Sequence, residues 1–515
     1  VTTLEVSGNT QTITGMDITS DLRVRADDIT GGAKGDATLK ITAVDSTGDS
    51  DVVKVARRLS TAGNGTNTVE TSGIETLDIV VEDTLGAAPG DTATFNLAKF
   101  DGTSVVATEG SKDIADVAIN LGVLKSSVTS VDTSGVKGAQ TASALNSTSA
   151  VTFKGNGNAV NTFTGGEWAD TFTISESGAV AHVIAGNDGV DTATVSIKNG
   201  FVNPTGINVE TVNFDQKAGD DVTLTGNLNV TTTKFTLTGG NSLSTFTHLA
   251  TPILDGVTNY DASGFAGNVV LGVTQNFLDD TVTITGTGST TDALSASVNA
   301  AGIDKPKVKD IYTINFATTG FAGIAGLDLS DSSGFKKISS TIGAGDTVTL
   351  DKLDSGASLK VVGGGAAAVF NPKLSDDTGS DDKLTIELKA RTANVATPIN
   401  DNFSINVSDV ETITLKSSTT AGETLSLANV SMDAASATTA LKITGSKPLT
   451  ATATHEDIAT IDASGMSEGG SYTENAAGGG RARAEATPAI GTVIGKAIES
   501  HAGGDGVIDA FAMMM

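Results

Sequence analysis

The sequence predicts an all-β protein built from many short strands, and three observations lead to that class. Glycine is abundant, with 60 residues, whereas only 8 prolines occur and aromatic residues make up 4% of the 515 residues. Short segments alternate Thr with a single apolar residue, as half-buried strands do. Related motifs also recur at equal spacing. We therefore expect an elongated, multi-domain chain of β-solenoid or β-sandwich repeats, because this length exceeds one ordinary core.

A nine-residue unit occurs three times between residues 156 and 194. The copies are NGNAVNTFT (156–164), GGEWADTFT (165–173) and GNDGVDTAT (186–194). Each begins with Gly or Asn, has Asp or Asn at its sixth position, and ends in a Thr-apolar-Thr alternation that suits a strand. A parallel β-helix with bound calcium needs this order, because carbonyls and a carboxylate of the turn can face a cation.

This unit resembles the Gly-Gly-x-Gly-x-Asp-x-apolar-x nonapeptide of the RTX (repeats-in-toxin) proteins. The copies depart from it where Trp168 replaces the third Gly, Asn187 the second Gly and Asn161 the Asp. Asn187 fits a left-handed turn, since Asn tolerates positive φ. The rest of the chain is similar to calcium-dependent bacterial surface-layer (S-layer) proteins and large adhesins exported by type I secretion. The resemblance implies an RTX-like parallel β-helix with Ca²⁺ as cofactor and with metal ligands at Gly165, Gly166, Asp170, Gly186, Asp188, Gly189 and Asp191.

Adjacent carboxylates are further calcium candidates. They occur at Asp220-Asp221 and Asp279-Asp280, at predicted strand starts or loops. Two neighbouring carboxylates repel each other unless a cation lies between them. The alternative for these pairs, as for Asp376-Asp377 and Asp381-Asp382, is that they are simply solvated.

Two longer motifs set the period of the chain. Glu-Thr followed by an alternation begins at Glu75, Glu210 and Glu411, and an Asp-x-Ser-Gly turn begins at Asp132, Asp261 and Asp462, with a variant at Asp331. Glu210 precedes Asp261 by 51 residues, and Glu411 precedes Asp462 by the same 51. A unit of about fifty residues holds two to three solenoid turns or six to seven sandwich strands. In the Asp-x-Ser-Gly turn we expect an Asx-turn without a ligand, with Gly at positive φ.

These features divide the chain into five segments. We expect N-terminal β units over 1–140, a degenerate RTX segment over 141–200, β repeat units over 201–340 and 341–480, and a C-terminal tail over 481–515. Short helices are expected at 114–123, 294–302 and 488–500.

Composition excludes several classes of protein. Sixty acidic against 32 basic residues give a net charge of −28, which repels nucleic acid and anionic membranes and attracts divalent cations. Cysteine is absent, so disulfides and thiolate metal sites are excluded. No apolar run approaches the roughly 20 residues that span a bilayer. We expect a secreted protein at the cell surface.

The usual catalytic motifs are also missing. The sequence has no Gly-x-Ser-x-Gly elbow, no phosphate-binding Gly-Lys-Ser/Thr loop and no dinucleotide fingerprint, and His455-Glu456 lacks the second His of a zinc-protease helix. We therefore expect a non-enzymatic structural subunit of a calcium-stabilised S-layer or surface filament, which self-associates as a lattice or filament, with cell-surface polysaccharide as a further candidate partner. Because large apolar residues are few, calcium is expected to support both folding and assembly. The alternatives are a calcium-dependent adhesin or biofilm-matrix protein, and a polysaccharide-active β-helix enzyme.

Overall fold

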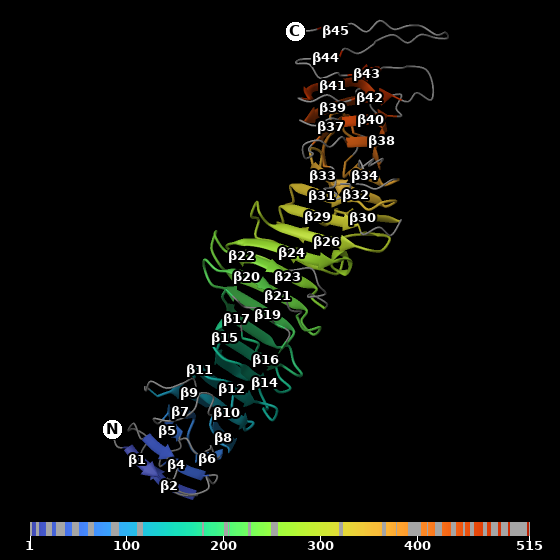
Figure 1. The fold of residues 1–515 in the computed structure, drawn as a ribbon. Helices are drawn as coiled ribbons and strands as arrows, with labels where there is room; N and C mark the ends of the chain where they lie inside the picture. Colours follow the sequence, from blue (N-terminus) through green and yellow to red (C-terminus); the bar gives the residue numbers. More distant parts are fainter. Residues whose placement is uncertain are drawn as a thin grey trace. The chain divides into compact units, whose positions relative to one another are not determined.

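In this computed structural model, short strands make up most of the described residues, and nearly all of their pairings are parallel. The structure describes residues 3–6, 10–16, 23–26, 37–43, 51–59, 66–83, 92–110, 117–177, 180–199, 204, 206–224, 228–248, 256–318, 323–362, 367–376, 378–389, 403–408, 410–417, 425–433, 439–445, 449–453, 458–466, 471–474, 483–485, 493–494 and 512–513. The fold is all-β, and its parallel strands are stacked as a β-solenoid. The chain divides into two units, residues 1–268 and 269–515 (Figure 1, blue to green and green to red).

Unit 1, residues 1–268, consists mainly of two parallel sheets whose strands alternate along the chain. The strands of its first sheet are β1 (Thr3–Val6), β3 (Arg23–Ala26), β5 (Val52–Leu59), β7 (Thr76–Asp83), β9 (Ser104–Glu109), β11 (Ser130–Gly135), β13 (Thr152–Asn156), β15 (Thr171–Ser177), β17 (Thr192–Ile197), β19 (Thr211–Gln216), β21 (Lys234–Gly239) and β23 (Asn259–Phe265). The second sheet holds β2 (Thr10–Met16), β4 (Ala37–Ala43), β6 (Thr66–Ser72), β8 (Thr92–Lys99), β10 (Ala118–Val123), β12 (Gln140–Ser143), β14 (Asn161–Thr164), β16 (Val183–Ala185) and β18 (Ile207–Asn208), and β20 (Asp221–Leu224) pairs with β22 (Thr245–His248).

Unit 2, residues 269–515, repeats this plan. One parallel sheet holds β24 (Asn268–Thr274), β26 (Ala293–Val298), β29 (Thr313–Thr318), β31 (Lys337–Thr341), β33 (Ser358–Val362), β35 (Lys383–Lys389), β37 (Thr412–Ser417), β39 (Thr439–Gly445) and β41 (Ile458–Met466). The facing sheet holds β27 (Gly302–Asp304), β30 (Ile324–Asp328), β32 (Thr347–Leu353), β34 (Val369–Leu374), β36 (Phe403–Ser408), β38 (Leu425–Asp433), β40 (Leu449–Ala453), β42 (Ser471–Glu474) and β43 (Arg483–Glu485). The remaining elements are the parallel pair β25 (Thr283–Thr285) and β28 (Lys307–Lys309), the antiparallel pair β44 (Val493–Ile494) and β45 (Ala512–Met513), and the 3-10 helix η1 (Gln275–Leu278).

Each coil of the solenoid follows from the alternation seen in the sequence. In β17 the side chains of Ala193, Val195 and Ile197 are buried, and the Thr and Ser residues between them point outward. Since neighbouring strands pair in register, like residues stack on like, and Thr171 lies beside Thr192. Because side chains alternate along a strand, every second residue, the apolar one, points into the solenoid interior.

The expected helices at 114–123 and 294–302 are wrong where the structure describes them. Ala118–Val123 forms strand β10 and Ala293–Val298 forms strand β26. In β26 the residues Leu294, Ala296 and Val298 are buried at every second position, which a strand accommodates and a helix does not. The segment 488–500 lies outside the described residues except for 493–494, which form β44.

The interior contains more bulky side chains than the composition suggested. Phe153 stacks on Phe163 at 5.3 Å between ring centroids and on Phe172 at 5.1 Å. Among the described residues, ten Phe and one Tyr are fully buried: Phe95, Phe100, Phe153, Phe163, Phe172, Phe214, Phe235, Phe246, Phe316, Phe370 and Tyr260. The described coils are therefore not short of bulky apolar side chains, because more than half of the few aromatic residues are buried inside them.

The period of 51 residues corresponds to two coils. Thr211 of β19 pairs with Lys234 of β21, and Thr236 of β21 pairs with Asp261 of β23. Strands β37, β39 and β41 repeat the arrangement in unit 2. Of the two architectures left open for the fifty-residue unit, the solenoid is the observed one. In the parts of the chain that the structure describes, no helix is both long and apolar enough to cross a membrane.

Candidate functional site

The sixth residue of the second nonapeptide, Asp170, is buried and bonded to backbone. Its Oδ1 accepts the N–H of Val151 at 2.6 Å, and its Oδ2 accepts the N–H of Gly166 at 2.7 Å. The side chain is 1% exposed. Both oxygens therefore satisfy backbone donors that the turn and the preceding coil would otherwise leave unpaired.

The same contact is repeated in the next two coils. Asp191 accepts the backbone N–H of Asp170 through Oδ1 at 2.7 Å, and Glu210 accepts the N–H of Asp191 through Oε2 at 2.8 Å. Each acid immediately precedes a strand, β15, β17 or β19. We call Asp170, Asp191 and Glu210 the carboxylate ladder, since each side chain fastens its own coil to the one before.

Equivalent contacts occur in other coils, at positions that the sequence presented as different motifs. Glu75 accepts the N–H of Asp51 at 2.9 Å, and Glu411 accepts the N–H of Asp382 at 2.8 Å. The Glu-Thr motif and the Asp-Thr of the nonapeptide thus occupy one structural position, the residue before a strand. A Glu or an Asp reaches the same backbone donor.

Asp292 is a member of this class that sequence reasoning missed. Its Oδ1 accepts the N–H of Val269 at 2.9 Å, and its Oδ2 accepts the N–H of Thr287 at 2.8 Å. This double contact matches that of Asp170. The signal was an acid directly before an alternating segment, and the helix expected at 294–302 obscured it.

Burial raises the pKa of both aspartates of the ladder. Desolvation raises the pKa of Asp170, and the backbone bonds from Gly166 and Val151 oppose that shift. The pKa of Asp191 is raised to about 6, first by desolvation and then by the charges of Glu210 and Asp170, against the bond from the backbone of Asp170. Within the described part of the chain, Asp191 Oδ2 has no hydrogen-bond partner.

Two predicted glycines leave room for these carboxylates. A Cβ on Gly186 would lie 1.9 Å from Asp191 Oδ2, and one on Gly165 would lie 2.2 Å from Asp170 Oδ2. A Cβ on Gly166 would lie 2.9 Å from the carbonyl oxygen of Ala144. Gly165 and Gly186 lack a side chain because the following acid folds back over the turn, whereas Gly166 approaches the backbone of the preceding coil.

The third nonapeptide turn contains Asn187, Asp188 and Gly189. Asn187 has φ 72° and Gly189 has φ 116°, so the left-handed conformation expected at Asn187 is confirmed. Asn187 Nδ2 donates to the carbonyl oxygen of Gly165 at 2.9 Å. A Cβ on Gly189 would lie 2.7 Å from the carbonyl oxygen of Trp168, whose side chain is 51% exposed. Asp188 is exposed at the tip of the turn.

The adjacent acidic pairs lie at the start of β20 and directly after η1. Asp221 Oδ1 accepts the N–H of Thr245 at 2.8 Å, and Asp220 is half-buried beside it. Asp279 and Asp280 are exposed, and Asp279 Oδ1 accepts the N–H of Thr281 at 2.8 Å. These carboxylates thus bond within their own turns and strands and take no part in the ladder bonds.

The donor set decides how calcium could be held. Calcium takes six to eight oxygen ligands. Among the described residues no group of three or more His, Asp or Glu is placed to hold a metal ion. Three of the four carboxylate oxygens of Asp170 and Asp191 accept backbone N–H bonds. The buried aspartates consequently do not fit a closed calcium centre within one chain.

A histidine takes the place of the acid on the other edge of unit 1. His182 precedes β16, and its Nδ1 accepts the N–H of Asn161 at 3.3 Å. Burial lowers the pKa of His182 to about 4, so the ring is neutral and can accept. The sixth residue of the first nonapeptide, Asn161, donates through Nδ2 to the carbonyl oxygen of Asn156 at 2.8 Å.

The Asp-x-Ser-Gly motif forms the expected Asx-turn. Ser134 donates its N–H to Asp132 Oδ1 at 3.1 Å, and Ser263 donates to Asp261 Oδ1 at 2.9 Å. The expectation of positive φ is wrong for Gly135 and Gly264. Gly is needed there for close approach, since a Cβ on Gly135 would lie 2.8 Å from the Cγ2 of a Thr in the neighbouring strand.

Comparison with known proteins adds no relative to this description: no protein-family model, no characterised protein and no solved structure matches the chain.

Proposed function

We propose that this protein is a structural subunit of an extracellular assembly, such as a surface layer or filament, whose copies associate through calcium bound at exposed acidic turns. One observation carries the proposal: the chain uses its buried acids to fasten coils together and presents other acids outward. Asp170, Asp191 and Glu210 accept backbone bonds between coils, whereas Asp188, Asp279 and Asp280 are exposed on turns.

A stacked solenoid is suited to such a role. Every coil adds one strand to each sheet and buries one more layer of apolar side chains, so length grows without a change in architecture. The repeating outer surface then offers the same contact many times over. When two copies make many weak contacts at once along their length, the overall affinity is much higher than that of any single contact.

Calcium fits between copies better than within one. Asp279 and Asp280 supply two carboxylates, fewer than the six to eight oxygens that calcium requires, so the remaining ligands come from water or from another copy. Copies that each carry a net charge of −28 also repel one another, and a divalent cation between their carboxylates removes that repulsion. The secreted location and type I export rest on the RTX resemblance.

Because the interior of the coils is already filled with apolar side chains, calcium is not needed in place of a core. Stacked aromatic rings such as Phe153 on Phe172, and the ladder bonds, hold coils together without a metal ion. Calcium in this proposal acts on assembly and adds to stability, rather than replacing the core.

Sedimentation velocity and electron microscopy test the proposal. The full chain in about 0.15 M salt is expected to be monomeric with a chelator and to form ordered oligomers at about millimolar calcium. A chain that stays monomeric in calcium contradicts it. Binding of a cell-surface polysaccharide by that monomer would favour the adhesin alternative, and turnover of the polysaccharide would favour an enzyme.

A further inference from the structure

A row of hydroxyl side chains crosses the outward face of the first sheet of unit 1. Its members are the first residues of successive strands, each paired in register with the next: Thr76, Ser104, Ser130, Thr152, Thr171, Thr192 and Thr211. Two residues further along the strands, a second row contains Thr173, Thr194, Asn213 and Thr236. We call Thr152, Thr171, Thr173, Thr192, Thr194, Thr211 and Asn213 the threonine face.

The side chains of the threonine face point away from the solenoid interior. Phe172, Ala193 and Val212 lie between the two rows and are fully buried, so the residues on either side of them face outward. All seven members of the face are partly or fully exposed. Within the face, Asn213 Nδ2 donates to Thr194 Oγ1 at 3.3 Å.

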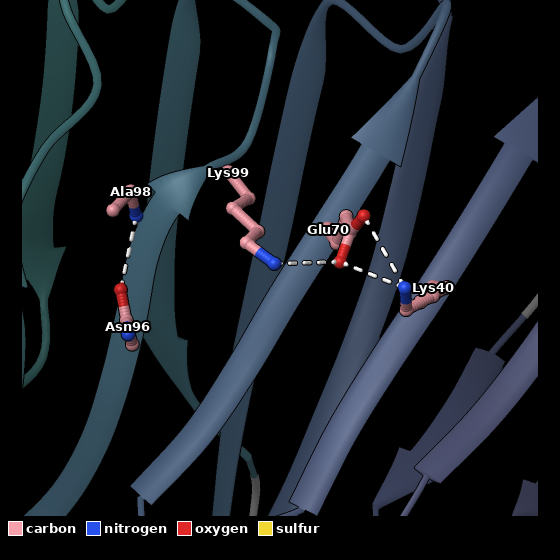
Figure 2. Close-up of polar contacts among 5 residues, drawn as sticks. All are labelled: Lys40, Glu70, Asn96, Ala98 and Lys99. Carbon is pink, nitrogen blue, oxygen red and sulfur yellow. Dashed lines mark hydrogen bonds and ion pairs between the residues drawn. The ribbon is translucent and has the colours of Figure 1, made fainter.

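No charged residue belongs to the threonine face, although the chain has a net charge of −28. In the neighbouring coils the same second row is charged, with Lys154 at 3.9 Å from Asp132. The second sheet of unit 1 is charged as well, since Glu70 lies between Lys40 at 3.3 Å and Lys99 at 3.4 Å (Figure 2). Because repulsion between their charges keeps two acidic copies apart, the threonine face is where they can approach most closely.

Exposed acids border the threonine face at one end of its strands. Glu167 and Asp188 lie in the turns that lead into β15 and β17, and both are exposed. Each is the third residue of its nonapeptide, so the two occupy equivalent places in successive coils. Among the described residues no three acids of one chain are placed to hold a metal ion. One copy therefore offers too few carboxylates here for calcium, which takes six to eight oxygen ligands.

We propose that the threonine faces of two copies pack against each other, with calcium held between the acidic turns at their edge. A threonine hydroxyl both donates and accepts hydrogen bonds, so a face of threonines is complementary to itself. A two-fold axis parallel to the strands places the acidic turns of one copy beside those of the other. Packed sheets lie about 10 Å apart, a distance that side chains from both faces fill. This contact rests on the self-association proposed above and identifies the surface that it uses.

The size of the threonine face explains why the contact needs calcium. Seven strands about 4.8 Å apart, carrying rows about 7 Å apart, give roughly 300 Å² per copy. A stable interface buries about 800 Å² on each partner. The face is thus too small to hold two copies by itself, and in chelator the acidic turns add repulsion. Calcium between these turns removes the repulsion and supplies the missing affinity, so the chain is monomeric in chelator.

Chemical cross-linking of the full chain tests this contact. The chain has no cysteine, so Thr173→Cys introduces a unique thiol at the centre of the threonine face. A short bismaleimide should give several times more cross-linked dimer in about 2 mM calcium than in chelator. Thr162→Cys is the matched control, because Thr162 is an outward, half-buried residue of β14 in the second sheet. It should show no such increase.

Two lysines on the threonine face give a second, independent measurement. T173K/T194K should lower the association constant in calcium about tenfold or more, because each ammonium group would be buried without a partner. T141K/T162K adds the same charge to the second sheet, at residues that are also paired in register, and should change the constant far less. Circular dichroism in chelator checks that each variant keeps its strands.

Three outcomes overturn the contact: equal cross-linking of T173C and T162C, cross-linking of T173C that is the same in chelator as in calcium, or wild-type association of T173K/T194K. If the wild type still assembles in calcium, the calcium proposal stands and the copies meet through another surface. If the wild type stays monomeric in calcium, the proposed function fails together with this contact.

Discussion

Asp191 Oδ1 accepts the backbone N–H of Asp170 at 2.7 Å, so the acid of one nonapeptide holds the acid of the previous one in place. The bond joins residues of two successive coils at the point where each coil enters its strand. Along the ladder the nonapeptide aspartates thus act as backbone acceptors between coils. Substitutions at these acids, measured without calcium, separate this role from metal binding.

Removing the side chain of Asp170 should destabilise unit 1 in the absence of calcium. Asp170→Ala leaves the N–H groups of Val151 and Gly166 without an acceptor, and each buried unsatisfied group costs about 1–3 kcal/mol. Urea unfolding in chelator measures the loss. The control Asp188→Asn, at an exposed turn tip, should stay within about 0.5 kcal/mol of the wild type. Equal stability of Asp170→Ala and the wild type in chelator would show that the ladder does not support the fold.

The need for glycine at position 186 should depend on the carboxylate of Asp191, which lies against it. Gly186→Ala places a Cβ 1.9 Å from Asp191 Oδ2 and should destabilise the chain by about 1–3 kcal/mol. The same substitution should cost much less in an Asp191→Ala background, since the clashing oxygen is gone. A double-mutant cycle by urea unfolding gives this coupling. Additive effects would mean that Gly186 is needed for a reason other than Asp191.

The aromatic stack should stabilise the fold whether or not calcium is present. Phe172→Ala removes a fully buried ring from the stack with Phe153 and should cost about 3–5 kcal/mol. Thermal or urea unfolding, with chelator and then with calcium, should give the same loss. Trp168→Ala, at a half-exposed ring, serves as the control with a small effect. If calcium restored the stability of Phe172→Ala to that of the wild type, the ion and not the aromatic stack would be what stabilises the fold.

Acid should weaken the fold through a histidine buried among aromatic rings. His248 lies 6.5 Å from Phe235 and 6.3 Å from Phe246 between ring centroids, and burial lowers its pKa to about 3. The folded state thus keeps the ring neutral while the unfolded state protonates it near pH 6.5. Its contribution is complete above pH 6.5 and is lost progressively as pH falls toward 3.

The variant His248→Leu isolates that contribution. The difference in unfolding free energy between the wild type and His248→Leu should shift against the wild type between pH 6.5 and pH 4, while the opposite pH dependence of Asp191 is common to both and cancels. A difference that is constant over this range would show that His248 is accessible to protons in the folded chain.

The sequence predicts the strands well and the roles of the acids poorly, for a physical reason. The period-two alternation in segments such as Thr192–Ile197 specifies which side chains enter the interior, and the parallel solenoid follows from stacking such segments. The identity of the group that an acid contacts depends on the coil below it, some twenty residues away. The sequence therefore marks Asp170 as special without showing that its partner is Val151.

The same limit explains the two helices expected in error. Leu294–Gly302 is rich in Ala, Leu and Ser, which suit a helix locally, yet the registered neighbours of β26 on both sides convert it into a strand. Composition likewise does not reveal what fills the interior. A count of 4% aromatics does not show that most of them stack in the interior.

The most direct test of the whole account is sedimentation velocity of the folded full chain during a calcium titration from chelator to about 2 mM in about 0.15 M salt, with circular dichroism on the same samples. We predict an unchanged strand spectrum throughout, with the monomer giving way to large ordered species as calcium reaches the millimolar range. A chain that remains one sedimenting species at every calcium concentration would contradict the account.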